Sequence, residues 1–266
     1  MSTSEVALLG GIAGMTIFLG LPLGRMRNPA PRLRTFLNAA TIGILVFLLF
    51  DVLAHANETV ELSLLAAVDH EASWARFLAL AAVFAGGIIV GLVGLVYFDQ
   101  RVIAGSGGGW LASWTWTRRL SLMIAVGIGL HNFSEGLAIG QSAASGEVDL
   151  ALALIVGFGL HNATEGFGIV APMAADGERP SWRFLAALGL IGGAPTFIGT
   201  LVGQTVVNDI LFVAFLAVAA GSILYVIVQL IKVSSRQGPA ELIMWGIVAG
   251  LAAGFATDYV LVASGG

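Results

Sequence analysis

The sequence predicts an all-α, polytopic membrane protein with eight transmembrane helices, an inverted repeat and both termini outside the cytoplasm. Three observations carry this prediction: an apolar composition, a series of long apolar runs, and a polar motif that occurs inside two of those runs. Of the 266 residues, 58% are hydrophobic and only 11% are charged, whereas soluble domains carry about 25% charged residues. Mean hydropathy is +0.94, so residues 1–266 are expected to form a single transmembrane domain.

Eight apolar runs are long enough to cross a bilayer as helices. Each run has roughly 18 to 25 residues, and about 20 helical residues cross a hydrocarbon core about 30 Å thick. Charged or Pro/Gly-rich segments separate the runs. The expected membrane-spanning cores are Val6–Leu23, Phe36–His55, Phe77–Phe98, Leu120–Ala144, Leu150–Met173, Phe184–Val207, Ile210–Val233 and Leu242–Val262.

The basic residues predict the orientation of these helices. With eight spans, eleven of the twelve Lys and Arg residues fall on one side of the membrane, and only Arg76 falls on the other. Short loops rich in Lys and Arg stay in the cytoplasm, so both termini are expected outside it. The eleven residues are Arg25, Arg27, Arg32, Arg34, Arg101, Arg118, Arg119, Arg179, Arg183, Lys232 and Arg236.

Composition also excludes several kinds of function. The chain has no cysteine, which excludes disulfides, thiolate metal sites and thiol catalysis. A net charge of −4 without a basic patch argues against nucleic-acid binding. We therefore expect a multi-pass protein of the cell membrane, and any metal ion that it binds must be held by nitrogen and oxygen atoms.

A polar motif occurs twice, in the apolar runs Leu120–Ala144 and Leu150–Met173. Residues 127–139 read GIGLHNFSEGLAI and residues 157–169 read GFGLHNATEGFGI, with eight identities in thirteen positions. The connection between the two runs is short, so the predicted helices are antiparallel neighbours and the two copies enter from opposite membrane faces. This pattern indicates an inverted repeat, which in transporters places the substrate site near the membrane midplane.

Each copy of the motif carries an imidazole and a carboxylate four residues apart, which places both groups on one helical face. An acidic residue at the bilayer centre costs about 2.5 to 3.5 kcal/mol, so two such sets indicate a shared function rather than helix-to-helix hydrogen bonds alone. Two imidazoles and two carboxylates suit Zn2+, and also Fe2+, Mn2+, Co2+ or Cd2+. The candidate metal ligands are His131, Asn132, Glu135, His161, Asn162 and Glu165.

Glycine is abundant, with 36 residues, and several glycines have the four-residue spacing of close helix packing. Gly136 and Gly166 follow the two motif glutamates; each either frees a backbone carbonyl as a further ligand or packs against another helix. Packing ridges are expected at Gly87 with Gly91, at Gly199 with Gly203, and at Gly246 with Gly250 and Gly254.

The two motifs resemble the HNxPEG and HExPEG signatures in the fourth and fifth helices of the ZIP (Zrt/Irt-like) metal transporter family. The resemblance covers the whole chain in topology and is specific over the two motifs. It implies a transporter and not an enzyme: a single transmembrane transporter domain that takes a divalent cation, Zn2+ first, into the cytoplasm through a site between these helices. It also implies a homodimer, alternating access by movement of one helix bundle against another, and no resident cofactor.

The chain departs from the family pattern at four places. Ser134 and Thr164 stand where the family usually has proline, so strong kinks are not expected there. Asn162 stands where an acidic residue is common, and the segment 192–195 lacks the glutamate that the family often places in its sixth helix. Both losses remove carboxylates from an adjacent second metal position, so one strong site is expected rather than two.

Three polar residues in other apolar runs need an explanation. Asp51 and His55 are four residues apart near the predicted outer end of their helix. They are candidate metal ligands on the route to the motif; alternatively, Asp51 bonds a neighbouring helix and His55 lies at the membrane interface. Asp258 is a structural partner, a transient ligand or a proton carrier, and the sequence does not rank these roles.

A membrane-embedded, metal-dependent hydrolase is the alternative interpretation of the same His/Glu cluster. Such an enzyme needs three protein ligands, an open position for water and a general base. The sequence contains no H-E-x-x-H motif, and a duplicated motif suits a symmetric ion path better than an asymmetric hydrolytic site.

Overall fold

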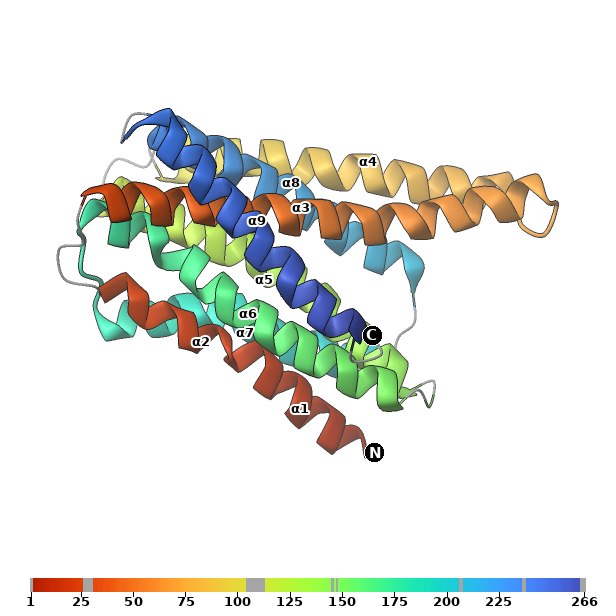
Figure 1. The fold of residues 1–266 in the computed structure, drawn as a ribbon. Helices are drawn as coiled ribbons and strands as arrows, with labels where there is room; N and C mark the ends of the chain where they lie inside the picture. Colours follow the sequence, from red (N-terminus) through yellow and green to blue (C-terminus); the bar gives the residue numbers. More distant parts are fainter. Residues whose placement is uncertain are drawn as a thin grey trace.

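The described residues form an all-helical bundle without strands in a computed structural model (Figure 1). These residues are 2–25, 31–103, 113–144, 146, 148–205, 208–235 and 238–263. The helices are α1 (Thr3–Met15), α2 (Ile17–Gly20), the 3-10 helix η1 (Leu21–Arg25), α3 (Pro31–Val68), α4 (Trp74–Tyr97), the π-helix η2 (Phe98–Ile103), α5 (Trp116–Ala144), α6 (Val148–Asp176), α7 (Trp182–Gly203), α8 (Asp209–Ser234) and α9 (Ala240–Ala263).

Eight helical segments in the described ranges are long and apolar enough to cross a membrane, which confirms the predicted number. The first segment consists of α1, α2 and η1, and each of the other seven lies within a single helix. The first is interrupted at Thr16, whose hydroxyl donates a hydrogen bond to the carbonyl oxygen of Ala13 at 2.7 Å. Such back-bonding competes with regular helical hydrogen bonding.

The helices alternate in direction, so the connections collect at two ends of the molecule. Both chain termini lie at the same end as the turn between α3 and α4 (Figure 1), and we call this the termini end. We call the opposite end the basic end, because it carries Arg25, Arg32, Arg118, Arg179 and Lys232. Of the other basic residues predicted on that side, Arg27 and Arg236 lie outside the described part of the chain.

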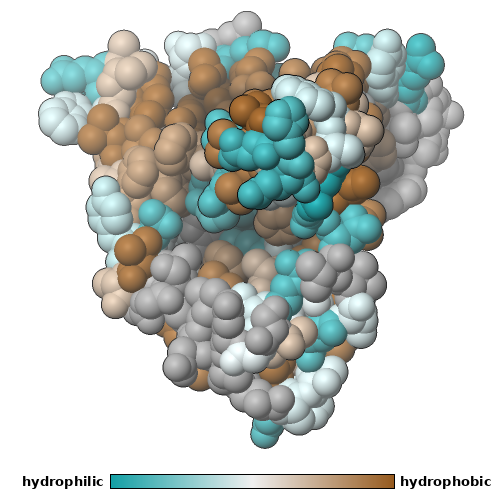
Figure 2. Space-filling view, turned by 90° about the vertical axis from the view of Figure 1, so that its right-hand side faces the viewer, coloured by the Kyte–Doolittle hydropathy of each residue, from teal (hydrophilic) through white to brown (hydrophobic). Residues whose placement is uncertain are grey.

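Helix α3 is longer than the sequence predicted. The expected span ended at His55, but α3 continues to Val68, and α4 begins at Trp74. No Gly or Pro interrupts residues 56–68, and Asn57 donates a hydrogen bond to Glu61 one turn later at 2.8 Å. Figures 1 and 2 show the resulting α3–α4 hairpin projecting beyond the other helices at the termini end, with a hydrophilic tip.

The helices pack as two groups. The motif bundle comprises α1, α2, η1, α5, α6 and α7, and the frame bundle comprises α3, α4, α8 and α9. Contacts between the bundles run mainly through α5 with α8, α3 with α6, and α6 with α9. Both polar motifs therefore lie in the motif bundle, on the two helices, α5 and α6, that contact the frame bundle.

Glycine contacts show the inverted repeat within the motif bundle. A Cβ atom on Gly136 of α5 would collide with the carbonyl oxygen of Thr196 in α7. In the same way, a Cβ atom on Gly166 of α6 would collide with the carbonyl oxygen of Ile17 in α2. The packing of α5 against α7 is therefore equivalent to the packing of α6 against the first membrane-spanning segment.

The frame bundle repeats the same relation. A Cβ atom on Gly43 of α3 would meet the backbone of α9 at Gly250, and one on Gly221 of α8 would meet the backbone of α4 at Gly91. The predicted glycine ridges are thus packing surfaces, since only a residue without a Cβ permits such close approach. The two halves of the chain, on either side of the motif helices, have equivalent helix contacts.

Candidate metal site

The two motifs form a buried polar cluster where α5 and α6 pack together. The described cluster residues are at most 5% exposed: His131, Asn132 and Glu135 on α5, and Asn162 and Glu165 on α6. Burying carboxylates and amides away from water is unfavourable unless they are paired or bind a cation. Their convergence between two membrane-spanning helices therefore defines the candidate site.

His131 and Glu135 form an ion pair within α5. The Nε2 atom of His131 lies 3.2 Å from Oε1 of Glu135, and both side chains are almost fully buried. The spacing of four residues places them one helical turn apart on the same face, as the sequence predicted. An imidazole and a carboxylate are thus held next to each other in a buried position.

The two motif asparagines hold their helices against neighbouring backbones. Asn132 Nδ2 donates to the carbonyl oxygen of Gly192 in α7 at 2.9 Å, and Asn162 Nδ2 donates to that of Ala13 in α1 at 3.1 Å. These equivalent bonds fix both amide planes. Within the described residues, both Oδ1 atoms are buried without a hydrogen-bond partner, so each remains available to accept a hydrogen bond or to contact a cation.

The side chain of His161 lies outside the described part of the chain. Among the side chains that are described, no three His, Asp or Glu residues are close enough together to hold a metal ion. The structure thus brings together one half of the predicted ligand set on α5 and places Glu165 and Asn162 opposite it on α6. The assignment of all six motif residues as ligands stays a prediction.

The residues that follow the motif glutamates act in packing. Gly136 and Gly166 contact the backbones of α7 and α2, which supports the packing alternative for these glycines. The absence of proline before Glu135 agrees with a regular helix: α5 runs unbroken through Ser134, whose hydroxyl donates to the carbonyl oxygen of Leu130 at 3.4 Å.

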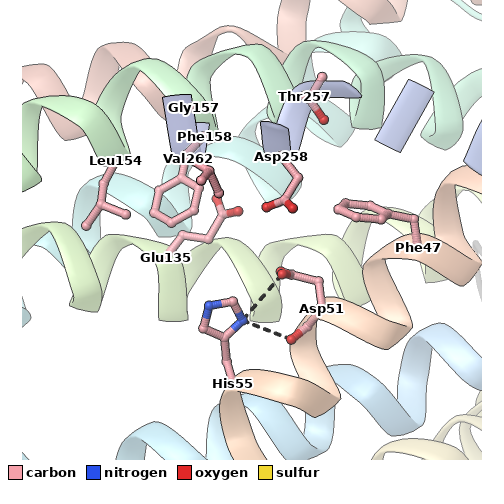
Figure 3. A pocket seen from close by; sticks show the side chains of 10 residues that line it. All are labelled: Phe47, Asp51, His55, Glu135, Leu154, Gly157, Phe158, Thr257, Asp258 and Val262. Carbon is pink, nitrogen blue, oxygen red and sulfur yellow. Dashed lines mark hydrogen bonds and ion pairs between the residues drawn. The ribbon is translucent and has the colours of Figure 1, made fainter. Parts of the chain in front are cut away.

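A cavity between α3, α5, α6 and α9 reaches Glu135 (Figure 3). It extends toward the termini end, because its lining includes Leu154 near the start of α6 and Val262 near the end of α9. It has a volume of about 210 Å³, and an adjoining cavity of about 200 Å³ reaches His131. Asp51 and His55 of α3 line both cavities. The Nδ1 atom of His55 lies 3.4 Å from Oδ1 of Asp51 and 2.9 Å from the Asp51 carbonyl oxygen.

Asp258 of α9 lines the same cavity. Figure 3 shows its carboxylate directed into the space that the carboxylates of Asp51 and Glu135 also face. Sequence reasoning left three roles open for Asp258, because periodicity did not reveal which helices would surround it. The only indication in the sequence that Asp258 has a functional role was an acidic residue in an apolar run.

A polar cluster surrounds Glu178, in the connection between α6 and α7 at the basic end. Thr115 and Thr117 donate hydrogen bonds to Oε2 of Glu178 at 2.6 and 2.7 Å, and Arg118 forms an ion pair with Oε1. Burial alone would raise the pKa of this carboxyl, but the two hydroxyl donors and Arg118 outweigh burial and lower its pKa. Glu178 therefore ties the start of α5 to the end of α6.

Fold and site together define an integral membrane protein with an ionisable site buried between its transmembrane helices. Residues 114–255 match the family model described as "ZIP Zinc transporter". The chain is also 32% identical over 136 residues to the zinc transporter ZupT of Streptococcus mutans, in a match that covers 50% of this chain and 51% of that protein.

The family match covers more than half of the chain, and the chain belongs to the ZIP zinc transporter family. The resemblance of the two motifs is confirmed by this match, and the family together with the eight spans makes the chain a multi-pass protein of the cell membrane. The chain spans about half the length of the curated relative that it matches.

Proposed function

We propose that this protein transports a divalent cation, with Zn2+ as the preferred ion and Fe2+, Mn2+, Co2+ and Cd2+ as weaker candidates, into the cytoplasm. The observation that carries the proposal is the burial of His131, Glu135 and Glu165 where α5 and α6 pack together, with a cavity that reaches Glu135 from one end of the molecule. Family membership supports the same activity. We further propose that residues 1–266 act as one transporter domain and that it works without a resident cofactor.

The proposed ligands come from both motifs. His131 and Glu135 approach the ion from α5, and His161 and Glu165 approach it from α6. Two carboxylates balance the charge of a divalent cation, and imidazole nitrogen with carboxylate oxygen is a donor set typical of zinc. Asn132 and Asn162, whose Oδ1 atoms accept no hydrogen bond in the described part of the chain, complete the site.

The proposed route begins at the termini end. Asp51, His55 and Asp258 line the cavity and lie on the way to Glu135, so we assign them to capture and relay of the ion. Arg76, the basic residue predicted at that end, forms an ion pair with Asp209, which reduces its repulsion of an arriving cation. Negative charge along a narrow path raises the local concentration of cations.

We propose that the basic end faces the cytoplasm, as its Arg and Lys residues favour. The partners of the protein are then the metal ion, the surrounding lipid bilayer and a second copy of the chain. We propose the homodimer because family resemblance implies it; the apolar face of α4, with Leu78, Ile89 and Val90 more than half exposed in the single chain, suits contact with lipid as well as with a second copy. The interface itself is a prediction.

Purified protein in proteoliposomes provides the test. We expect saturable uptake of Zn2+ that competing divalent ions reduce, and no uptake by the double variant Glu135→Ala/Glu165→Ala. Glu61→Ala is the matched control, because it removes a carboxylate from the projecting part of α3. Wild-type uptake by the double variant would refute the proposal, and turnover of a lipid or peptide without metal flux would favour the hydrolase.

A further inference from the structure

Because of the inverted repeat, each position on α3 has an equivalent position on α8 at the other end of the frame bundle. Gly43 of α3 and Gly221 of α8 make equivalent contacts with their partner helices. Eight residues further along each helix, the relation pairs Asp51 with Gln229, and it likewise pairs Phe47 with Tyr225. Thirty residues separate the two motifs, so Glu135 corresponds to Glu165.

Equivalent positions are open at one end and closed at the other. Leu154 and Phe158 of α6 line the cavity at the termini end. Their counterparts on α5, Ile124 and Ile128, are each 1% exposed and belong to the same buried apolar cluster as Tyr225. The two ends thus have equivalent helices but differ in packing: the termini end has a cavity, and the equivalent place at the basic end is filled. The structure therefore represents the state that opens toward the termini end.

The side chains at the two ends differ in charge. On α3 the cavity carries Asp51 and His55, whereas the equivalent positions on α8 are Gln229 and Val233. Position 258 on α9 corresponds by the same relation to position 99 in η2, and the sequence has aspartate at both positions. The loss of a carboxylate is therefore specific to α8.

Alternating access requires a cavity at the basic end in the opposite state. We propose that Gln229 lines that cavity, together with Tyr225 and Glu165, and that it keeps cation binding weak there. This inference rests on the proposed transport function. A neutral amide holds a divalent cation less tightly than a carboxylate does, because binding strength follows the charge of the ligands. The ion gradient sets the direction of net flux. The difference between Asp51 and Gln229 instead determines how fast the ion leaves at the basic end.

Restoring the missing carboxylate tests the role of Gln229. We expect Gln229→Asp to lower the maximal rate of Zn2+ uptake by about tenfold without raising KM, because the ion is retained at the exit. Gln229→Asn, which has the shape of aspartate without its charge, should transport within about twofold of the wild type. Equal rates in the two variants, whether both normal or both reduced, would overturn the proposal.

Thiol labelling tests the cavity separately from transport. The chain has no cysteine, so Gln229→Cys and His55→Cys each introduce a single thiol. We expect an impermeant thiol reagent to modify Gln229→Cys from the basic side and His55→Cys from the termini side. A Gln229→Cys thiol that is unreactive from both sides in detergent-free membranes would overturn the cavity, even if the wild type transports metal. Absence of wild-type uptake would instead refute the proposed function and leave the labelling result to decide on the cavity.

Discussion

The two ends of the bundle have equivalent helix contacts but different cavities. At the termini end, α3, α6 and α9 surround a cavity that contains Asp51, His55 and Asp258. At the basic end, the equivalent space is filled by apolar side chains and is bordered by the cluster around Glu178. The backbone repeat is therefore responsible for the common architecture, and a smaller set of side chains distinguishes the two ends.

The comparison also separates two kinds of motif residue. Gly136 and Gly166, with the amide nitrogens of Asn132 and Asn162, make equivalent contacts with neighbouring helices. The carboxylates are not equivalent in their access, because Glu135 lines the cavity from the termini end. An ion that arrives from that end meets Glu135 on α5.

The largest expected effect compares the two motif glutamates directly. Glu135→Ala and Glu165→Ala should each lower Zn2+ uptake by about 100-fold or more, since each removes a charged ligand from a buried site. Uptake in proteoliposomes, normalised to monodisperse protein on a sizing column, measures the effect. Near-normal uptake by either single variant would show that the two copies do not share one site.

Packing glycines provide the next comparison. Gly136→Ala and Gly166→Ala should each destabilise the protein by about 2 to 4 kcal/mol, because the added methyl collides with a backbone carbonyl. Gly86 and Gly94 of α4 have no neighbouring atom within 4 Å of the position that a Cβ would occupy, so alanine there should be neutral or should stabilise by up to about 1 kcal/mol. Thermal unfolding in detergent compares the four variants, and equal losses would contradict the packing role.

The cavity acids should affect ion capture more than the transport step. We expect Asp51→Asn and Asp258→Asn to raise the KM for Zn2+ by about tenfold while the maximal rate changes less. Initial uptake rates over a range of Zn2+ concentrations separate the two parameters. A fall in the maximal rate at unchanged KM would instead place these residues in the conformational change.

The smallest effect concerns the basic end and depends on pH. The pKa of Glu178 is lowered in the folded protein, so its contribution to stability is present at neutral pH and is lost as the pH falls through the folded pKa. We expect Glu178→Gln to cost about 1 to 3 kcal/mol at neutral pH and nothing in strong acid. Unfolding measured across acidic pH tests this, and a loss that is independent of pH would contradict it.

Much of the fold follows from the sequence. Apolar runs of sufficient length predict the eight spans, and four-residue glycine spacing predicts the ridges at Gly87, Gly199 and Gly246. The duplicated motif indicates the antiparallel pairing of α5 and α6. These features depend on neighbouring residues or on regular spacing along the chain, so they can be predicted from one sequence.

Other features depend on contacts between distant segments. Hydropathy indicates where an apolar run ends, but α3 continues as a helix through Glu58 and Glu61 because it packs on α4 beyond the bundle. The bonds from Asn132 to Gly192 and from Asn162 to Ala13 join residues far apart in the sequence. The place of Asp258 in the cavity likewise depends on how the two bundles meet.

The most direct test of the metal site is X-ray absorption at the zinc edge on the purified, zinc-loaded protein. We expect one tightly bound ion with a shell of about four nitrogen and oxygen ligands at about 2.0 to 2.2 Å, two of them imidazoles from His131 and His161. His131→Ala should remove one imidazole from that shell. A shell of oxygen atoms without imidazole, or one that is unchanged in His131→Ala, would contradict the assignment of the two motifs as the metal site.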